Sequence, residues 1–433
     1  MKHINISSHR YCFCLGILFS GLFLTPSAIA NSPSSYQDRQ LQTLFSLALE
    51  NSPVIQISVE QQNAARDNKE VMASFLKPDV RFKSELSYSW MQKQSFARTG
   101  SQLQASYPLY QPDRKDLYGL ASYQHFEKKW QLDEVKQSLL LKVSNLYFNF
   151  WIQKSEQLFL QKEFESISEI MEQVKQRFTI GYQDLNDISD IQARLDRNRA
   201  DLIKIEQRLH IIQIDFESLL GTHIDLSEFL QPERFASVGE LDVTSEKMKE
   251  RILDHPAMRR YDQALLAINK KVDYEKNKDG IVIQAFGAVI NNQSEGYFYD
   301  DAQGAKVGLT LNIPLYLGGQ TNASIAKARA ESRQLTAQKR QKELSLTASF
   351  KGSNESLKHN QKRLLALQAV LASNKQALTA AENGLITGNR NILDLLDAQR
   401  SLHRAERDIQ VVINNLWLNW YLYLWSIGEI NTL

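Results

Sequence analysis

The sequence predicts an α+β membrane protein built from one structural unit that occurs twice in the chain. The first observation is an internal repeat: the two halves align in order at an offset of 203 to 207 residues, so that residues 107–110 correspond to residues 313–316. The second is a very long run of helix-forming residues in each half. The third is a pair of segments with alternating apolar and polar residues, which precedes each long run. Each half therefore reads helix, two strands, long helix, turn, helix.

Residues 1–30 have the features of a signal peptide. Lys2 and Arg10 make a basic start, an apolar run follows, and residues 28–30 form a small-x-small cleavage motif. The apolar run is short for a transmembrane helix. We expect the mature chain to start near Asn31, and an uncleaved anchor is the alternative.

Cysteine use and charge restrict the possible functions. Cys12 and Cys14 are the two cysteines of the chain, and both lie in the leader. The mature chain is therefore expected to have no disulfide and no cysteine-bound metal. The full chain has 51 basic and 49 acidic residues, and removal of the leader leaves 49 of each. This balance does not indicate nucleic acid as a partner.

The predicted helices follow the same order in both halves. The run from residue 113 to residue 177 would be about 100 Å long, which implies packing along its length as in a coiled coil. The two shorter helices together match the long one, so we expect them to stack end to end beside it. The helices are expected at 41–76, 113–177 and 185–219 in the first repeat (31–221), and at 246–276, 322–384 and 392–427 in the second repeat (246–433), with 222–245 as a connecting segment.

The predicted strands have one apolar and one polar face, and are about 79–90, 101–110, 281–290 and 305–316. After residue 30 no apolar run approaches the length of a transmembrane helix, so a membrane-spanning form would use β-strands. The alternation is typical of a transmembrane β-barrel, and a sheet with one face in water is the alternative. Four strands cannot close a barrel. Twelve strands from three chains are the smallest closed set with a useful lumen, so the geometry favours a trimer.

Three motifs resemble those of the TolC-like outer-membrane efflux protein family. Residues 46–53 (SLALENSP) resemble its amino-terminal helix, residues 314–319 (PLYLGG) its strand-to-helix corner, and residues 388–399 (GNRNILDLLDAQ) its helix-turn-helix tip. The resemblance extends over residues 41–428. Leu385 is a departure, because a tyrosine often stands at this tip position in the family.

The resemblance implies an outer-membrane exit channel of a tripartite efflux pump or a type I secretion system. Such a channel is a homotrimer with a twelve-stranded β-barrel among outer-membrane lipids, continued by a long α-helical coiled-coil barrel in the periplasm. It is a passive conduit that docks a periplasmic adaptor (membrane fusion) protein and an inner-membrane ABC or RND transporter. A soluble periplasmic coiled-coil scaffold or adaptor protein is the alternative.

Four aspartates at the start of the last helix of each half are the candidate gate residues. Asp187 and Asp190, like Asp394 and Asp397, are spaced i, i+3 and share a helix face. Acids are favoured at helix starts by the helix dipole, which alone would explain them. The resemblance implies that these acids ring the periplasmic aperture, where three chains would form carboxylate rings that favour cations. It also implies that Arg390 pairs with Asp187 of a neighbouring tip.

Gly181 and Gly388 stand where the long helices are predicted to end. Glycine in a left-handed conformation is a common helix stop, and the resemblance adds that these tips contact the adaptor. The eight histidines show no metal-ligand spacing, and Gly318-Gly319 lacks the lysine of a phosphate-binding loop. We therefore expect no catalytic site, no metal and no cofactor, and hence no enzyme.

Overall fold

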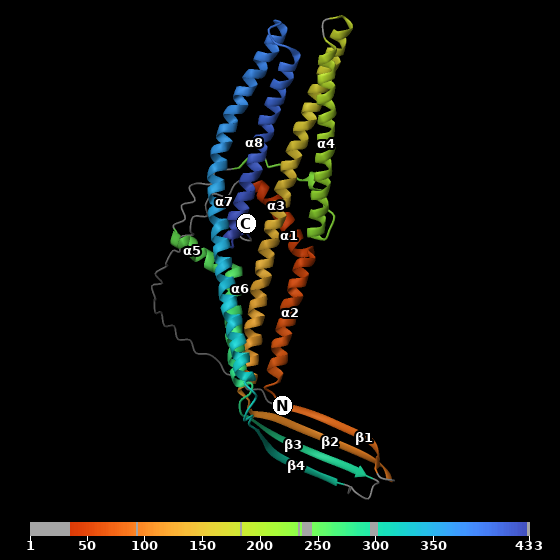
Figure 1. Ribbon diagram of the computed structural model, residues 1–433, viewed down its shortest axis with the longest axis vertical. Helices are drawn as coiled ribbons and strands as arrows, with labels where there is room; N and C mark the ends of the chain where they lie inside the picture. Colours follow the sequence, from red (N-terminus) through yellow and green to blue (C-terminus); the bar gives the residue numbers. More distant parts are fainter. Residues whose placement is uncertain are drawn as a thin grey trace, which may run out of the picture.

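The computed structural model describes residues 35–91, 94–181, 184–232, 234–235, 245–294 and 302–430. The predicted leader and its cleavage site lie outside these residues. The helices run side by side along the long axis of the molecule, and a sheet projects at an angle from one end of them (Figure 1). Two helical hairpins end at the opposite pole, so the sheet and the hairpin tips are as far apart as the molecule allows.

The strands form one antiparallel sheet in the order β1-β2-β3-β4, and the two halves of the chain meet where β2 pairs with β3. β4 ends before residue 316, its predicted end, because Pro314 has no N–H to continue the ladder. β2 starts before residue 101, its predicted start, because the ladder with β1 continues to the Met91–Gln94 pair. The strands are β1 Asp79–Met91, β2 Gln94–Tyr110, β3 Val282–Ser294 and β4 Ala302–Asn312.

Helices make up most of the described chain. The long helix α3 has 68 residues and α7 has 67, so each is about 100 Å long. The helices of the first half are α1 Ser35–Asn51, α2 Pro53–Ser74, α3 Pro112–Thr179 and α4 Leu185–Leu220. After the short 3-10 turn Leu226–Glu228 come α5 Ser245–Asp254, α6 Pro256–Asn277, α7 Gln320–Ile386 and α8 Ile392–Ser426.

The segments expected to be helical at 41–76 and 246–276 are each broken once in the structure. α1 ends at Asn51 and α5 ends at Asp254, so Ser52 and His255 each stand between two helices. A proline follows each break and forms the first residue of the next helix. Proline has no N–H to bond back to the preceding turn, and it excludes the residue before it from the helical region.

The end-to-end stacking of the shorter helices is present in both halves. α4 ends at Gly221, whose φ is +71°, and a Cβ there would lie 3.1 Å from the carbonyl oxygen of Asn51. In the second half, a Cβ on Gly428, with φ of +78°, would lie 3.2 Å from Pro256 Cδ. The C-terminal end of α4 thus abuts the break before α2, and the C-terminal end of α8 abuts the break before α6. α2 and α4, and likewise α6 and α8, lie one after the other alongside α3 (Figure 1).

The main hydrophobic core lies at this level of the molecule. Phe148 and Tyr421 contact the rings of Trp417 and of each other, and all three residues are buried. The connecting segment is tied to this core, because Trp417 Nε1 donates to Arg234 O and the Tyr147 hydroxyl donates to Leu230 O. The connecting segment therefore joins both halves of the chain firmly at this level, which we call the equator.

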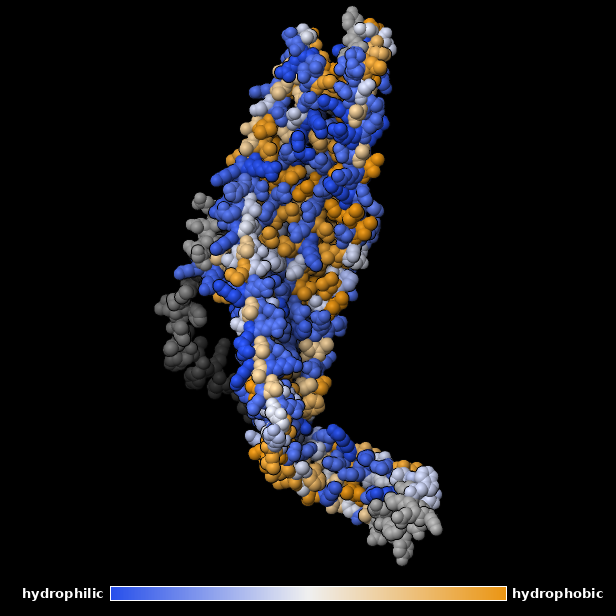
Figure 2. All heavy atoms as spheres, viewed as in Figure 1, coloured by the Kyte–Doolittle hydropathy of each residue, from blue (hydrophilic) through white to orange (hydrophobic). Residues whose placement is uncertain are grey.

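The sheet has an apolar face without protein cover. Phe82, Leu86, Trp90 and Val307 expose 69%, 79%, 77% and 87% of their surface. Figure 2 shows apolar residues gathered along the sheet and at its corner with the helices. A sheet whose uncovered face lay in water would carry polar residues on that face. Within the described residues, every helix is too short in apolar sequence to cross a membrane.

Candidate functional site: the hairpin tips and the ion pairs behind them

Glycines form both hairpin tips, as the sequence predicts. Gly181 has a φ of +80° and Gly388 a φ of +75°. No atom lies within 4 Å of a Cβ built on either glycine, so these positions need the left-handed backbone and not the small size. The turn after α7 is closed by a hydrogen bond from Asn389 N to Gly384 O of 2.9 Å.

Asp394 helps to start α8. It forms a capping box with Asn391: Asp394 N donates to Asn391 Oδ1 at 2.8 Å, and Asn391 N donates to Asp394 Oδ2 at 3.0 Å. In α4 the corresponding cap is Asp184, which accepts from Asn186 N at 3.3 Å. Within one chain, Asp394 therefore has the helix-start role that the sequence allows for it.

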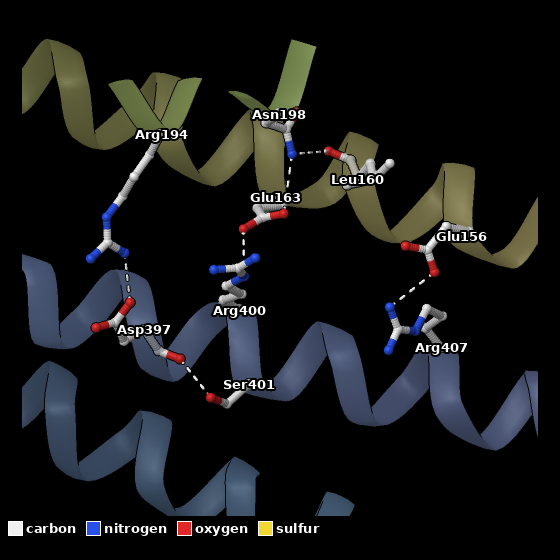
Figure 3. Close-up of polar contacts among 9 residues, drawn as sticks. All are labelled: Glu156, Leu160, Glu163, Arg194, Asn198, Asp397, Arg400, Ser401 and Arg407. Carbon is white, nitrogen blue, oxygen red and sulfur yellow. Dashed lines mark hydrogen bonds and ion pairs between the residues drawn. The ribbon is translucent and has the colours of Figure 1, made fainter. Parts of the chain in front are cut away.

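The other candidate residues have different surroundings. Asp397 forms an ion pair with Arg194, whose Nη1 donates to Asp397 Oδ1 at 2.6 Å, and this pair joins α8 to α4 (Figure 3). Asp190 is exposed on α4, and Asp187 is half-buried. Arg390 bonds through its N–H to Gly384 O at 3.1 Å, and its side chain packs over that glycine. Within one chain, the structure therefore pairs Asp397 with Arg194 and holds Arg390 against its own tip.

A second ion pair lies about one turn behind the first and is better buried. The Glu163 side chain on α3 is 10% exposed and accepts from Arg400 Nε of α8 at 2.8 Å. Its other oxygen accepts from Asn198 Nδ2 of α4 at 3.1 Å, and the same amide donates to Leu160 O at 3.1 Å. This group connects α3, α4 and α8, as Figure 3 shows.

Further ion pairs continue the series toward the equator. Arg407 of α8 donates to Glu156 of α3 at 2.9 Å. Burial opposes the charge of Arg407, but pairing with Asp408 and Glu156 outweighs burial and raises the pKa of the guanidinium. Lys162 of α3 pairs with Glu406 of α8 at 2.8 Å. Burial raises the pKa of Glu406, but the bond from Lys162 and the nearby His403 lower it overall.

We call the pairs Arg194–Asp397, Arg400–Glu163, Arg407–Glu156 and Lys162–Glu406 the cross-hairpin ladder. Each pair joins the α3–α4 hairpin to α8 of the α7–α8 hairpin. Sequence reasoning found only Asp397 of this set. A usable signal was present, because Glu156 and Glu163, like Arg400 and Arg407, are seven residues apart and so lie on one face of their helices.

Chemically, the ladder can hold the two hairpins together through ion pairs. In the described part of the chain, no group of three or more histidine, cysteine, aspartate or glutamate side chains could hold a metal ion.

An uncovered apolar sheet at one pole, a helical stalk about 100 Å long and two hairpin tips at the other pole define a membrane-embedded exit duct. The sequence matches the outer membrane efflux protein family over residues 44–222 and 279–416, and the chain belongs to that family. It is an outer-membrane channel protein with a large periplasmic part, of the kind that serves efflux and type I secretion.

Relatives agree over nearly the whole chain. Outer membrane protein TolC of Vibrio cholerae is 25% identical over 405 residues, which cover 88% of this chain and 89% of the relative. Proteases secretion protein PrtF of Dickeya chrysanthemi is 21% identical, with coverage of 92% and 90%. Among solved structures, the Campylobacter jejuni CmeC outer membrane channel superposes with a TM-score of 0.81 at 14% identity, covering 99% of this chain and 94% of that one.

Proposed function

We propose that three copies of this chain form one continuous duct whose periplasmic end is a gate made by the hairpin tips. The gate contains Asp187, Asp190, Asp394 and Asp397, together with Arg390. The observation that supports it is the cross-hairpin ladder, because ion pairs that bridge the hairpins begin beside the tips, at Arg194–Asp397. Three-fold symmetry would repeat each aspartate into a ring of carboxylates, which attracts cations at a constriction.

The duct is passive in this proposal, and it is not an enzyme. Its tips, at Gly181 and Gly388, contact a periplasmic adaptor protein, through which an inner-membrane ABC or RND transporter delivers the cargo. The relatives named for TolC and for protease secretion support both kinds of machine. The uncovered apolar face of the sheet supports contact with outer-membrane lipid and does not suit a soluble scaffold.

Single-channel recording in a planar bilayer tests the gate. Asp394→Asn combined with Asp397→Asn is expected to lower cation selectivity and to weaken block by multivalent cations, because the carboxylate rings are lost. Arg390→Ala is expected to raise the resting conductance, because one tether between neighbouring tips is removed. Asp67→Asn, which changes an exposed aspartate on α2 far from the tips, is the matched control.

The trimer should survive these substitutions, since the tips are remote from the sheet. If the double variant keeps the selectivity of the wild type, Asp394 acts only as a helix cap and Asp397 only as the partner of Arg194, and the gate proposal is wrong.

A further inference from the structure

The polar face of the sheet has a definite composition. Residues in register lie on the same face, so Arg81, Gln104, Ala288 and Lys306 form one row across all four strands. The neighbouring row, Phe82, Leu103, Val289 and Ala305, belongs to the apolar face. In a barrel the apolar face contacts lipid, and the polar face lines the lumen.

The charges on the lumenal face are unequal. Among the strand residues that the structure describes, Arg81, Lys83, Arg98 and Lys306 of this face are basic, and Asp79 and Glu85 are acidic. Arg81 and Lys83 pair with the two acids at 2.6 and 3.1 Å, and all four side chains are well exposed, so these pairs are weak. Four basic and two acidic residues leave the face an excess of two positive charges per chain.

The position of two basic residues concentrates this charge. Arg81 lies on β1 and Lys306 on β4, which are the two edge strands of the sheet, and both belong to the same row. When sheets of adjacent chains join edge to edge, the basic residues of both edges come onto neighbouring strands. Because Asp79 and Glu85 also lie on β1, three chains give a zone of mixed charge with a basic excess around the lumen.

An apolar strip accompanies this zone. Phe286 and Ile290 of β3 point to the same lumenal face as Lys306, which is unusual for a lumenal wall. The Phe286 ring lies over Gly308, where a Cβ would come within 2.9 Å of the ring, and Lys306 Nζ is 5.9 Å from the ring centre. Ile290 lines a hollow of about 220 Å³ together with the basic Lys83 and Arg98 and the acidic Glu85.

We propose that this basic and apolar lumenal wall is a binding site for organic anions that carry an apolar ring, and that such anions are a class of cargo of the duct. The cations attract the carboxylate, sulfonate or phosphate group, and Phe286 and Ile290 contact the ring. The proposal rests on the duct function. It gives the two ends of the duct opposite character, since the proposed gate is acidic and the barrel wall is basic.

Block of the single-channel current by anions tests the site. Naphthalene-1,3,6-trisulfonate and citrate are added to the side that faces the barrel; both carry several negative charges, but only the first has an apolar ring. Both should reduce the wild-type current, the trisulfonate at the lower concentration. Arg98→Gln with Lys306→Gln should raise the half-blocking concentration of both probes roughly tenfold, and raised salt should weaken block through screening.

The apolar strip has its own variant. Phe286→Ser should weaken block by the trisulfonate several-fold and leave block by citrate unchanged. If this variant yields no trimer, Phe286→Leu provides the comparison, because it keeps apolar cover over Gly308 and loses the aromatic ring. Lys358→Gln with Arg363→Gln, on the exposed surface of α7, removes the same charge outside the barrel and is the matched control.

The outcomes separate the two proposals. A wild-type protein that conducts no current contradicts the duct function itself. A conducting wild type whose block is absent, or is equal in the wild type and in the Arg98 and Lys306 variant, overturns the anion site and leaves the duct intact. Loss of block in the Lys358 and Arg363 control would show a general effect of net charge and would also overturn the site.

Discussion

At the scale of single residues, His255, which lies between α5 and α6, is buried in its neutral form. It is fully buried; its Nδ1 accepts from Ala257 N at 3.0 Å, and its Nε2 lies 3.1 Å from Trp425 O. A neutral ring with its proton on Nε2 satisfies both contacts. Burial, reinforced by the nearby Lys342 charge, lowers the pKa of His255 to about 4, although Glu134 opposes the shift.

This residue should make stability depend on pH. In the unfolded chain a histidine binds a proton near pH 6.5, whereas folded His255 does so only near pH 4. Its contribution is therefore constant above about pH 6.5 and is lost as pH falls toward 4, by about 2 kcal/mol between pH 7 and pH 5.

The measurement is the thermal unfolding midpoint of the detergent-purified protein at pH 7 and pH 5. His255→Asn keeps a capping side chain and removes the titrating group. The midpoint should fall less with pH in the variant than in the wild type. An equal fall in both proteins would show that His255 does not titrate in this way.

At the scale of helices, the glycines at the two helix junctions, Gly221 and Gly428, have a role that the sequence alone did not reveal. Gly221 needs both a left-handed backbone and the absence of a Cβ, since a side chain would meet Asn51 O at 3.1 Å and Pro53 Cδ at 3.2 Å. Gly352, within α7, has neither need: its surroundings are open and its backbone is helical. Substitution by alanine should therefore have opposite effects on stability at Gly221 and at Gly352.

Gly221→Ala should destabilise the protein by about 1–2 kcal/mol, because alanine is strained at positive φ and also collides with the preceding junction. Gly352→Ala should stabilise it by roughly 0.5–1 kcal/mol, since alanine is the better helix former. Denaturant unfolding of the two variants beside the wild type measures both. A stabilising Gly221→Ala would mean that the junction rearranges at no cost.

Helices and strands were predictable where periodicity or uninterrupted helix formers determine them, as in α3 and β1. The breaks at Ser52 and His255 were not, because a proline at the first position of a helix and a proline that ends a helix are alike in sequence. The partner of Asp397 was not predictable either. The arginine that pairs with an exposed aspartate depends on how the packed helices are rotated about their axes. The local sequence does not determine this rotation.

At the scale of the whole molecule, four strands with an uncovered face need other strands to close the barrel. The mature protein purified from the outer-membrane fraction in detergent should have the mass of three chains and a circular dichroism spectrum with both helix and strand. The edges of β1 and β4 carry unpaired backbone groups, and only closure with other sheets satisfies them in lipid. A stable detergent-solubilised monomer would contradict the closed barrel.

The stacked helix junctions also have a mechanical consequence. α4 has 36 residues and is about 54 Å long, so a rotation of about 10° at Gly221 would carry its far end through about 9 Å without bending the helix. A small turn at the equator thus becomes a large displacement at the tip. Resistance to that turn is a torque, which grows with distance from the pivot. The exposed Arg194–Asp397 pair, weak as a contribution to folding, acts about 40 Å from this pivot and so has a long lever arm.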